Sequence, residues 1–77
     1  MQIPSIDLHT CELIPDALEK LETELFLLFQ KGERRIEVVH GIGEGKMAAA
    51  VHRELNRNPM VGSRLESDHG GSCIISL

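Results

Sequence analysis

The sequence predicts a small α/β fold with the element order strand–helix–strand–helix–strand–strand. A leucine-rich stripe at three- and four-residue spacing indicates an amphipathic helix, with short β-rich stretches before and after it. A glycine-rich turn separates the second of these stretches from another helical pattern. Strands that alternate with helices are joined by right-handed crossovers, so we expect the first three strands to run in the same direction.

The length and composition of the chain limit its organisation and location. Its 77 residues, 42% of them apolar, suffice for one domain over 1–77, with 1–4 as a short lead-in. No apolar run is long enough to span a membrane, so no membrane partner is expected. The two cysteines are too few for a disulfide framework and the first residues do not resemble a signal peptide. We therefore expect reduced thiols and a cytoplasmic location.

The first half of the chain is expected to hold one strand and one long helix. Residues 6–9 alternate apolar and polar side chains, which is typical of a half-buried strand. Pro15 and Asp16 suit the first turn of a helix, because proline loses no hydrogen bond there and an acid meets the positive end of the helix dipole. Lys31 and Gly32 end this helix. Its apolar stripe is Leu18, Leu21, Leu25, Leu28 and Phe29.

The second half is expected to hold three strands and one helix. The predicted strands are 34–40, 61–67 and 72–77, and the helix is 46–56. Asn58 and Pro59 end the helix, since the residue before a proline disfavours helical backbone angles.

Three parts of the chain are expected to meet at one edge of the sheet. The carboxyl ends of parallel strands share an edge, which is where ligands bind in open α/β folds. His9 ends the first strand and His40 ends the second. The third strand leads into the turn of Asp68, His69, Gly70 and Gly71. The candidate site is therefore at this edge.

Asp7 and His9 form the first candidate pair. They are two residues apart on a strand, so their side chains project from the same face. A carboxylate beside an imidazole fixes its tautomer and raises its basicity, which suits general acid–base catalysis. A structural role, such as a hydrogen bond to the neighbouring loop, explains the same pair and stays open.

The turn after His40 is the second candidate. Gly41, Gly43 and Gly45 alternate immediately before a helix, where inward-turned amides and the helix dipole can hold a phosphate. The spacing fits neither a Walker A loop nor the dinucleotide-binding fingerprint. A tight turn without a ligand is the alternative interpretation.

A zinc site is the third possibility, with His9, Cys11, His40 and His69 as the available ligands. None of the familiar ligand spacings is present, so we expect no tightly held metal. Cys11 and Cys73 are instead expected to be small buried apolar residues.

The charge distribution restricts how the chain could bind nucleic acid. A net charge of −4 argues against general nucleic-acid binding, and the presence of only two aromatic residues argues against base stacking. The negative charge lies mainly in residues 1–24, however, where six acids face one base. Residues 46–64 carry four bases against Glu54 alone, namely Lys46, Arg53, Arg57 and Arg64. This pattern permits phosphate-directed binding, although a solvated helix face would have the same charges.

Three motifs in this order resemble those of the Smr (small MutS-related) domain. They are Ile6-Asp7-Leu8-His9, His40-Gly41-x-Gly43-x-Gly45 and Gly70-Gly71-Ser72. The resemblance extends over residues 5–77. It implies a two-layer α/β sandwich, β-α-β-α-β-β, in which a four-stranded mixed sheet has both helices on one face. It also implies nicking or RNA-cleaving endonuclease activity, carried by Asp7, His9, His40, Gly41 and Gly43.

The chain departs from the family pattern at several positions. Thr10 stands where glycine is usual, Ile42 where lysine is frequent, and Glu44 where threonine is expected. Ala48 lies near the place of an expected arginine. These differences remove positive charge beside the expected phosphate site and add a carboxylate.

The leading hypothesis is a nucleic-acid-binding domain that cleaves phosphodiester bonds. His9, oriented by Asp7, acts as general base or acid, and His40 is the opposite proton-transfer group or stabilises phosphate charge. The amides of 41–45 hold a phosphate. Lys46, Arg53 and Arg57 follow the nucleic-acid backbone, and His69, Gly70 and Gly71 extend the edge of the site.

Several questions stay open at this level. The sequence does not decide between DNA and RNA, nor whether a divalent ion, Mg²⁺ or Mn²⁺, assists through Asp7. A non-catalytic module that binds nucleic acid, a ribosomal site or a protein partner through the same edge is the alternative. A small-anion or nucleotide-binding protein that uses the glycine turn alone is a third hypothesis.

Overall fold

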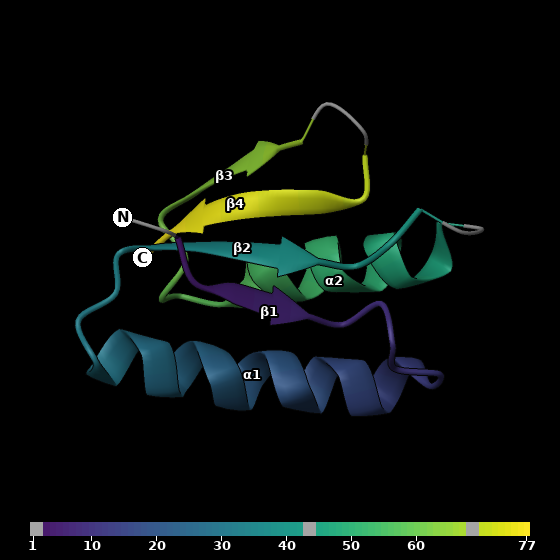
Figure 1. The fold of residues 1–77 in the computed structure, drawn as a ribbon, viewed down its shortest axis with the longest axis horizontal. Coiled ribbons are helices and arrows are strands. Elements are labelled where there is room, and N and C mark those ends of the chain that lie inside the picture. The colour runs from purple at the N-terminus through teal and green to yellow at the C-terminus, as the bar shows by residue number, and fades with distance from the viewer. Residues whose placement is uncertain (1–2, 43–44, 68–69) are drawn as a thin grey trace.

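The computed structural model describes residues 3–42, 45–67 and 70–77, and the elements follow the predicted order. They are β1 (Ser5–Asp7), α1 (Ile14–Gln30), β2 (Arg35–Val39), α2 (Lys46–Arg57), β3 (Ser63–Glu66) and β4 (Ser72–Ser76). Figure 1 shows the four strands as one sheet with the two helices packed beside it. Within the described ranges, no helix is long and apolar enough to cross a membrane.

The sheet is mixed, with the strand order β1-β2-β4-β3. β1 pairs with β2 in parallel, and β4 pairs antiparallel with both β2 and β3. β1, β2 and β3 therefore run in the same direction, as predicted, but β4 lies between β2 and β3 (Figure 1). Every residue of β3 is exposed, whereas Ser72, Cys73 and Ile75 of β4 are buried. The last strand of the chain thus belongs to the centre of the sheet.

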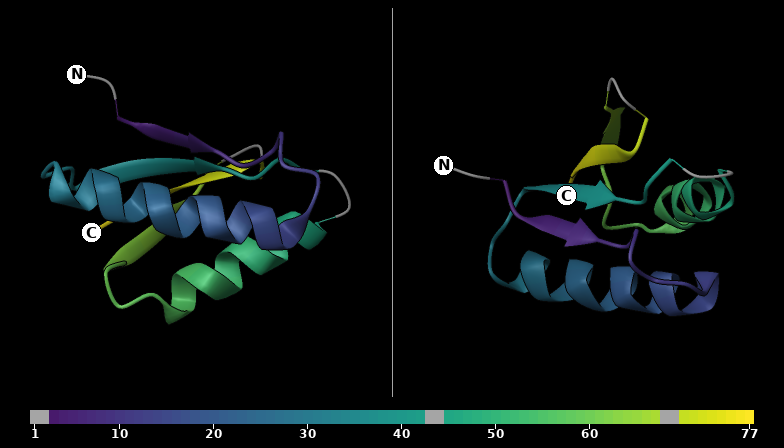
Figure 2. Two further views of the ribbon diagram at one scale, coloured as in Figure 1. Left: turned by 90° about the horizontal axis from the view of Figure 1, so that it is seen from below. Right: turned by 45° about the vertical axis from the view of Figure 1, so that its right-hand side comes forward.

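Both helices cover the same face of the sheet, which completes the predicted two-layer sandwich (Figure 2). The core lies between the two layers and consists of Ile6, Leu8, Ala17, Leu21, Leu25, Ile36, Val38, Val51, Leu55, Cys73 and Ile75. Phe29 was expected in the stripe of α1 but is exposed. At 3.6 residues per turn it lies about 80° around the helix from Leu21, at the margin of the buried face.

The two cysteines differ in accessibility, and this difference can be measured. Cys73 is fully buried in β4, and burial raises the pKa of its thiol to about 11, whereas Cys11 is half-buried. Because the thiolate is the reactive form, native protein at pH 8 is expected to react at Cys11 and not at Cys73. Titration with a chromogenic disulfide reagent should count one thiol before denaturation and two after it. Native Cys11→Ser protein should show none, and rapid labelling of that variant would contradict the burial of Cys73.

Candidate functional site

Three segments that are distant in the sequence meet at the carboxyl ends of β1 and β2. The amides of His40 and Gly41 both donate to the Gly71 carbonyl, at 3.0 and 2.9 Å. The Leu8 amide donates to the Val39 carbonyl at 2.7 Å, which continues the β1–β2 pairing beyond Asp7. The start of β4 is therefore fixed against the ends of the two parallel strands. The expected convergence at this edge is found.

Asp7 is the last residue of β1 and contacts His9 in the turn that follows, so the strand predicted over residues 6–9 ends two residues earlier than expected. One Asp7 carboxylate oxygen, Oδ1, accepts from the His9 backbone N–H at 3.0 Å and lies 3.1 Å from the His9 Nδ1. A carboxylate only accepts, so Nδ1 carries the hydrogen and the lone pair is left on Nε2. Lys20 of α1 donates to the Asp7 backbone carbonyl at 2.8 Å and ties this strand end to the helix. The imidazole is thus oriented as a base.

The hydrogen bond from the His9 ring is the main cause of a lowered pKa of the Asp7 carboxyl, below its usual 3.8, and the His9 backbone N–H adds to it. The His9→Ala variant is expected to bring this pKa back toward 3.8, because only the backbone bond remains. Carbon-13 NMR of the Asp7 carboxyl across an acid titration measures it. An Asp7 pKa that does not change in His9→Ala would contradict the contact, and Thr10→Ala is the control.

The same shift fixes the sign of a pH effect on stability. The folded-state pKa of Asp7 is lower than the unfolded one, so the contact stabilises the fold above about pH 3.8. That contribution is lost as the pH falls through the lower, folded-state value.

Gly41 determines where His9 lies. Its φ is +80°, a conformation that L side chains rarely adopt, and a Cβ built there would lie 3.3 Å from the His9 Cβ. A side chain at this position would therefore be strained and would press on the His9 side chain. The first glycine of the turn thus allows the chain after β2 to pack against His9, the catalytic candidate that follows β1.

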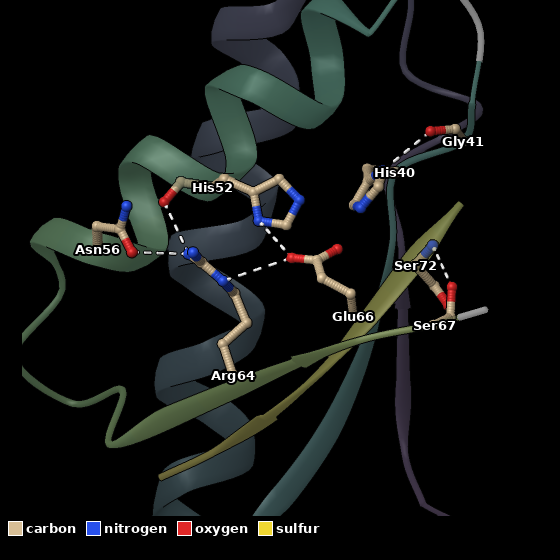
Figure 3. Close-up of polar contacts among 8 residues, drawn as sticks. All are labelled: His40, Gly41, His52, Asn56, Arg64, Glu66, Ser67 and Ser72. Carbon is tan, nitrogen blue, oxygen red and sulfur yellow. Dashed lines mark hydrogen bonds and ion pairs between the residues drawn. The ribbon is translucent and has the colours of Figure 1, made fainter. Parts of the chain in front are cut away.

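His40 is placed differently from the sequence expectation. Its side chain is only 3% exposed, and its Nδ1 lies 2.9 Å from the Gly41 carbonyl, to which it donates. Its other ring nitrogen points toward His52 and Glu66 (Figure 3). The rings of His40 and His52 are in edge-to-face contact with their centroids 5.1 Å apart. In this conformation, the expected proton-transfer role of His40 is not supported by its burial.

His52 and Glu66 are residues of this region that sequence reasoning missed. His52 Nδ1 lies 3.3 Å from Glu66 Oε1, which is within ion-pair distance although the angles are not those of a hydrogen bond. The pKa of His52 is lowered, mainly because the ring is partly buried. The negative charge of Glu66 acts in the opposite direction but is the smaller effect. Arg64 contacts Glu66 Oε1 at 3.6 Å and donates to the His52 carbonyl and the Asn56 Oδ1. Glu66 could have been found, because it ends the third strand at the predicted edge.

A cavity of about 400 Å³ opens beside the Asp7–His9 pair. His9, Gly41 and Lys46 line it, together with Cys11, Glu12, Ile14, His40, Ile42, Gly45 and Met47. The Gly41 amide donates to Gly71 and the Gly45 amide to the Ile42 carbonyl, at 3.1 Å. These two amides are therefore not available to hold a phosphate, contrary to expectation. The first turn of α2 begins at Lys46, at this cavity, and the backbone N–H groups of a first helical turn are the ones able to bind an anion.

The other predicted residues lie partly at this cavity and partly away from it, and Lys46 is the predicted base that lines it. Lys46, Arg53 and Arg57 are all exposed on α2 and, by their spacing, share one face of it. Arg57 lines a larger cavity of about 500 Å³ at the other end of α2, which Glu22 and Glu54 also line. Two carboxylates make that cavity a poor phosphate site despite its size. Gly70 is exposed and Gly71 buried beside His40, while Gly43, Glu44 and His69 lie outside the described residues.

No candidate zinc site joins His9 and Cys11 to His40 within the described residues. There, the group of potential ligands that lies together is instead His40, His52 and Glu66, within 4.8 Å of one another. Asp7, for which the sequence left assistance by a divalent ion open, contacts His9 and is not a member of this group.

Comparison with known proteins gives a consistent result. The Smr domain model matches residues 6–76. The chain is 38% identical over 71 residues to a protein of Halothermothrix orenii named endonuclease MutS2, of which it spans only 9%. The crystal structure of the Smr domain of Thermus thermophilus MutS2 superposes with a TM-score of 0.89 at 23% identity, covering 97% of this chain and 98% of that one. YdaL, a stand-alone small MutS-related protein from Escherichia coli, superposes with a TM-score of 0.80 at 19% identity, over 100% of this chain and 66% of that one.

Proposed function

The chain belongs to the Smr domain family, and from this premise we propose that it binds nucleic acid and cleaves phosphodiester bonds at the Asp7–His9 pair. The observation that carries the proposal is the hydrogen bond between Asp7 Oδ1 and His9 Nδ1, at 3.1 Å, beside an open cavity. It leaves Nε2 of an exposed imidazole free to accept a proton. The name of the Halothermothrix orenii relative, endonuclease MutS2, agrees with this chemistry.

In the proposed mechanism His9 is the general base. His9 Nε2 takes a proton from a water molecule as the water oxygen bonds to phosphorus, and the P–O bond to the leaving oxygen breaks. The electron pair of that bond leaves with the oxygen, which takes a proton from solvent, and the His9 imidazolium returns its own proton to solvent. Asp7 keeps the ring in the required tautomer and stabilises the imidazolium that forms, as a carboxylate does for other catalytic histidines. His40 has a positioning role, because its Nδ1–H holds the carbonyl of Gly41, against which His9 packs.

The phosphate is proposed to lie at the start of α2. Met47 and Ala48 precede the hydrogen bond from the Ala49 amide to the Gly45 carbonyl, at 2.9 Å, with which the helical bonding of α2 begins. Their amides and the Lys46 side chain provide the positive end of the site. Arg53 and Arg57 continue the same face for about 16 Å along the helix, which is the span of about five phosphates of a DNA strand. These bases offset the negative charge concentrated in residues 1–24.

A cleavage assay tests the proposal. The purified chain is incubated with branched DNA, plain duplex DNA and structured RNA, each with Mg²⁺, with Mn²⁺ and with a chelator. We expect cleavage of at least one substrate, and abolition in the Asp7→Ala/His9→Ala double variant. A folded chain that cleaves none of them, or a double variant as active as the unchanged protein, would overturn the proposal.

A non-catalytic binding module is the second candidate. It is favoured by Ile42, an exposed apolar side chain at the cavity where a cation would help to bind a phosphate. The salt dependence of binding separates the two kinds of partner. A steep loss of affinity with added salt indicates phosphate contacts, whereas a flat response indicates a protein partner.

A further inference from the structure

Three potential metal ligands from three different elements lie together beneath the end of β2. His40 follows β2, His52 is on α2 and Glu66 ends β3, and one ligand atom of each lies within 4.8 Å of the other two. Figure 3 shows the rings of His40 and His52 and the carboxylate of Glu66 directed toward a common space. Their separations in the sequence, 12 and 14 residues, match no familiar ligand motif.

His40 has the features of a metal-binding histidine. Its Nδ1–H donates to the backbone carbonyl of Gly41, so the lone pair is on Nε2. That nitrogen is buried and has no hydrogen-bond partner among residues 3–42, 45–67 and 70–77. Buried polar atoms without a partner are rare in folded proteins and call for an explanation. A histidine whose other nitrogen donates to a carbonyl is the usual arrangement beside a metal ion.

His52 and Glu66 already have the separation that a metal ion requires. Two ligands of a tetrahedral zinc ion lie about 3.4 Å apart when each bond is about 2.1 Å, and His52 Nδ1 lies 3.3 Å from Glu66 Oε1. His52 Nδ1 is also buried without a hydrogen bond. Arg64 contacts the Glu66 carboxylate and is itself held by Asn56 and the His52 carbonyl. The carboxylate is therefore oriented by its neighbours, as ligands at metal sites are.

We propose that His40 Nε2, His52 Nδ1 and the Glu66 carboxylate bind one Zn²⁺ ion. Two imidazoles and one carboxylate suit zinc and not Mg²⁺, which prefers oxygen ligands alone. The Glu66 side chain is 54% exposed, so it can move to close the remaining distance to His40, and solvent can reach the fourth position of the ion. The ligands of this site include neither Asp7 nor His9, and zinc binding does not depend on the proposed cleavage activity, although His40 also holds the Gly41 carbonyl beside His9.

Equilibrium zinc binding tests the proposal without an activity measurement. The chain is freed of metal by a chelator and then competes for Zn²⁺ with a chromogenic zinc indicator. We expect one equivalent to bind, and Co²⁺ to give the visible absorption of a tetrahedral site. His52→Ala and Glu66→Gln should each weaken binding at least about tenfold, since even neighbours that only orient ligands contribute that much. Both side chains are partly or largely exposed, so these variants are preferred to His40→Ala, which alters a buried residue.

Cys11→Ser and His9→Ala are the matched controls, because they remove the ligands of the alternative zinc site and should leave the affinity unchanged. Zinc should also raise the midpoint of thermal unfolding of the unchanged protein and not that of His52→Ala. Absence of binding, full affinity in both His52→Ala and Glu66→Gln, or loss of binding in the controls would each overturn the proposal. Because cleavage is assayed separately, either proposal can fail while the other holds.

Discussion

Replacement of His9 by alanine is expected to slow phosphodiester cleavage by about 10²–10⁴-fold, the usual contribution of a positioned acid or base. The imidazole is exposed at the cavity, and its contact with Asp7 through Nδ1 leaves Nε2 as the proton acceptor. Its loss removes the base without removing any residue of the core. The single-turnover rate on the best substrate of the assay above measures the effect.

Thr10→Ala is the matched control for this variant. Thr10 is the next residue and is also exposed, but it has no role in the proposed mechanism. We expect it to keep the rate of the unchanged protein, with both variants showing the same circular dichroism spectrum. Equal rates for His9→Ala and the unchanged protein, in preparations cleared of contaminating nucleases, would show that the base is another group.

The largest effect on stability is expected from Leu25→Ala, at about 2–5 kcal/mol of the free energy of unfolding. Leu25 is 1% exposed in the core between α1 and the sheet. A domain of this length has a total stability of about 4–12 kcal/mol, so the variant would lose a large part of it. Urea titration of both proteins measures the change in the free energy of unfolding. The dependence of this free energy on urea concentration is compared between the two, since an equal slope indicates that only stability has changed.

Phe26→Ala provides the control within the same turn of α1. Phe26 is a larger apolar side chain but is 52% exposed, so its truncation removes less buried surface than the truncation of Leu25. We expect a loss well below that of Leu25→Ala, since substitutions at the surface usually cost less than about 0.5 kcal/mol. A Phe26→Ala variant as unstable as Leu25→Ala would place the buried face of the helix on its other side.

The helices and strands were predictable because their signals are local. The leucine spacing of α1 and the alternation of residues 6–9 are properties of short windows, and the structure has an element at or overlapping each of them. The position of β4 between β2 and β3 could not be predicted in this way, because it depends on pairing between segments that are distant in the sequence. The apolar Cys73 and Ile75, against the polar Arg64 and Glu66 of β3, were the available indication of which strand is central.

The candidate site was predictable in part, for the same reason. The proximity of Asp7 and His9 follows from their two-residue spacing but not from a strand, because β1 ends at Asp7 and His9 lies in the turn after it. The Asp7 carboxylate accepts from the His9 backbone N–H, as Asp side chains do at turns. The direction of the His40 ring and the hydrogen bond from the Gly41 amide to the Gly71 carbonyl depend on how the strands pack. No short sequence pattern predicts either of them. His52 was missed because it reaches His40 only through the placement of α2 against the sheet.

The exposed edge strand β3 links the proposed zinc site to the behaviour of the protein at high concentration. An edge strand offers unpaired backbone groups to other chains, and charged side chains are a common protection against such pairing. β3 is the edge of the sheet in which every residue is exposed, and its charges are Arg64 and Glu66. Glu66 is therefore a proposed zinc ligand and also one of the two charges expected to oppose pairing of this edge with a second sheet. Neutral variants such as Glu66→Gln are therefore expected to lose the proposed ligand and, with it, part of the protection of this edge against self-association.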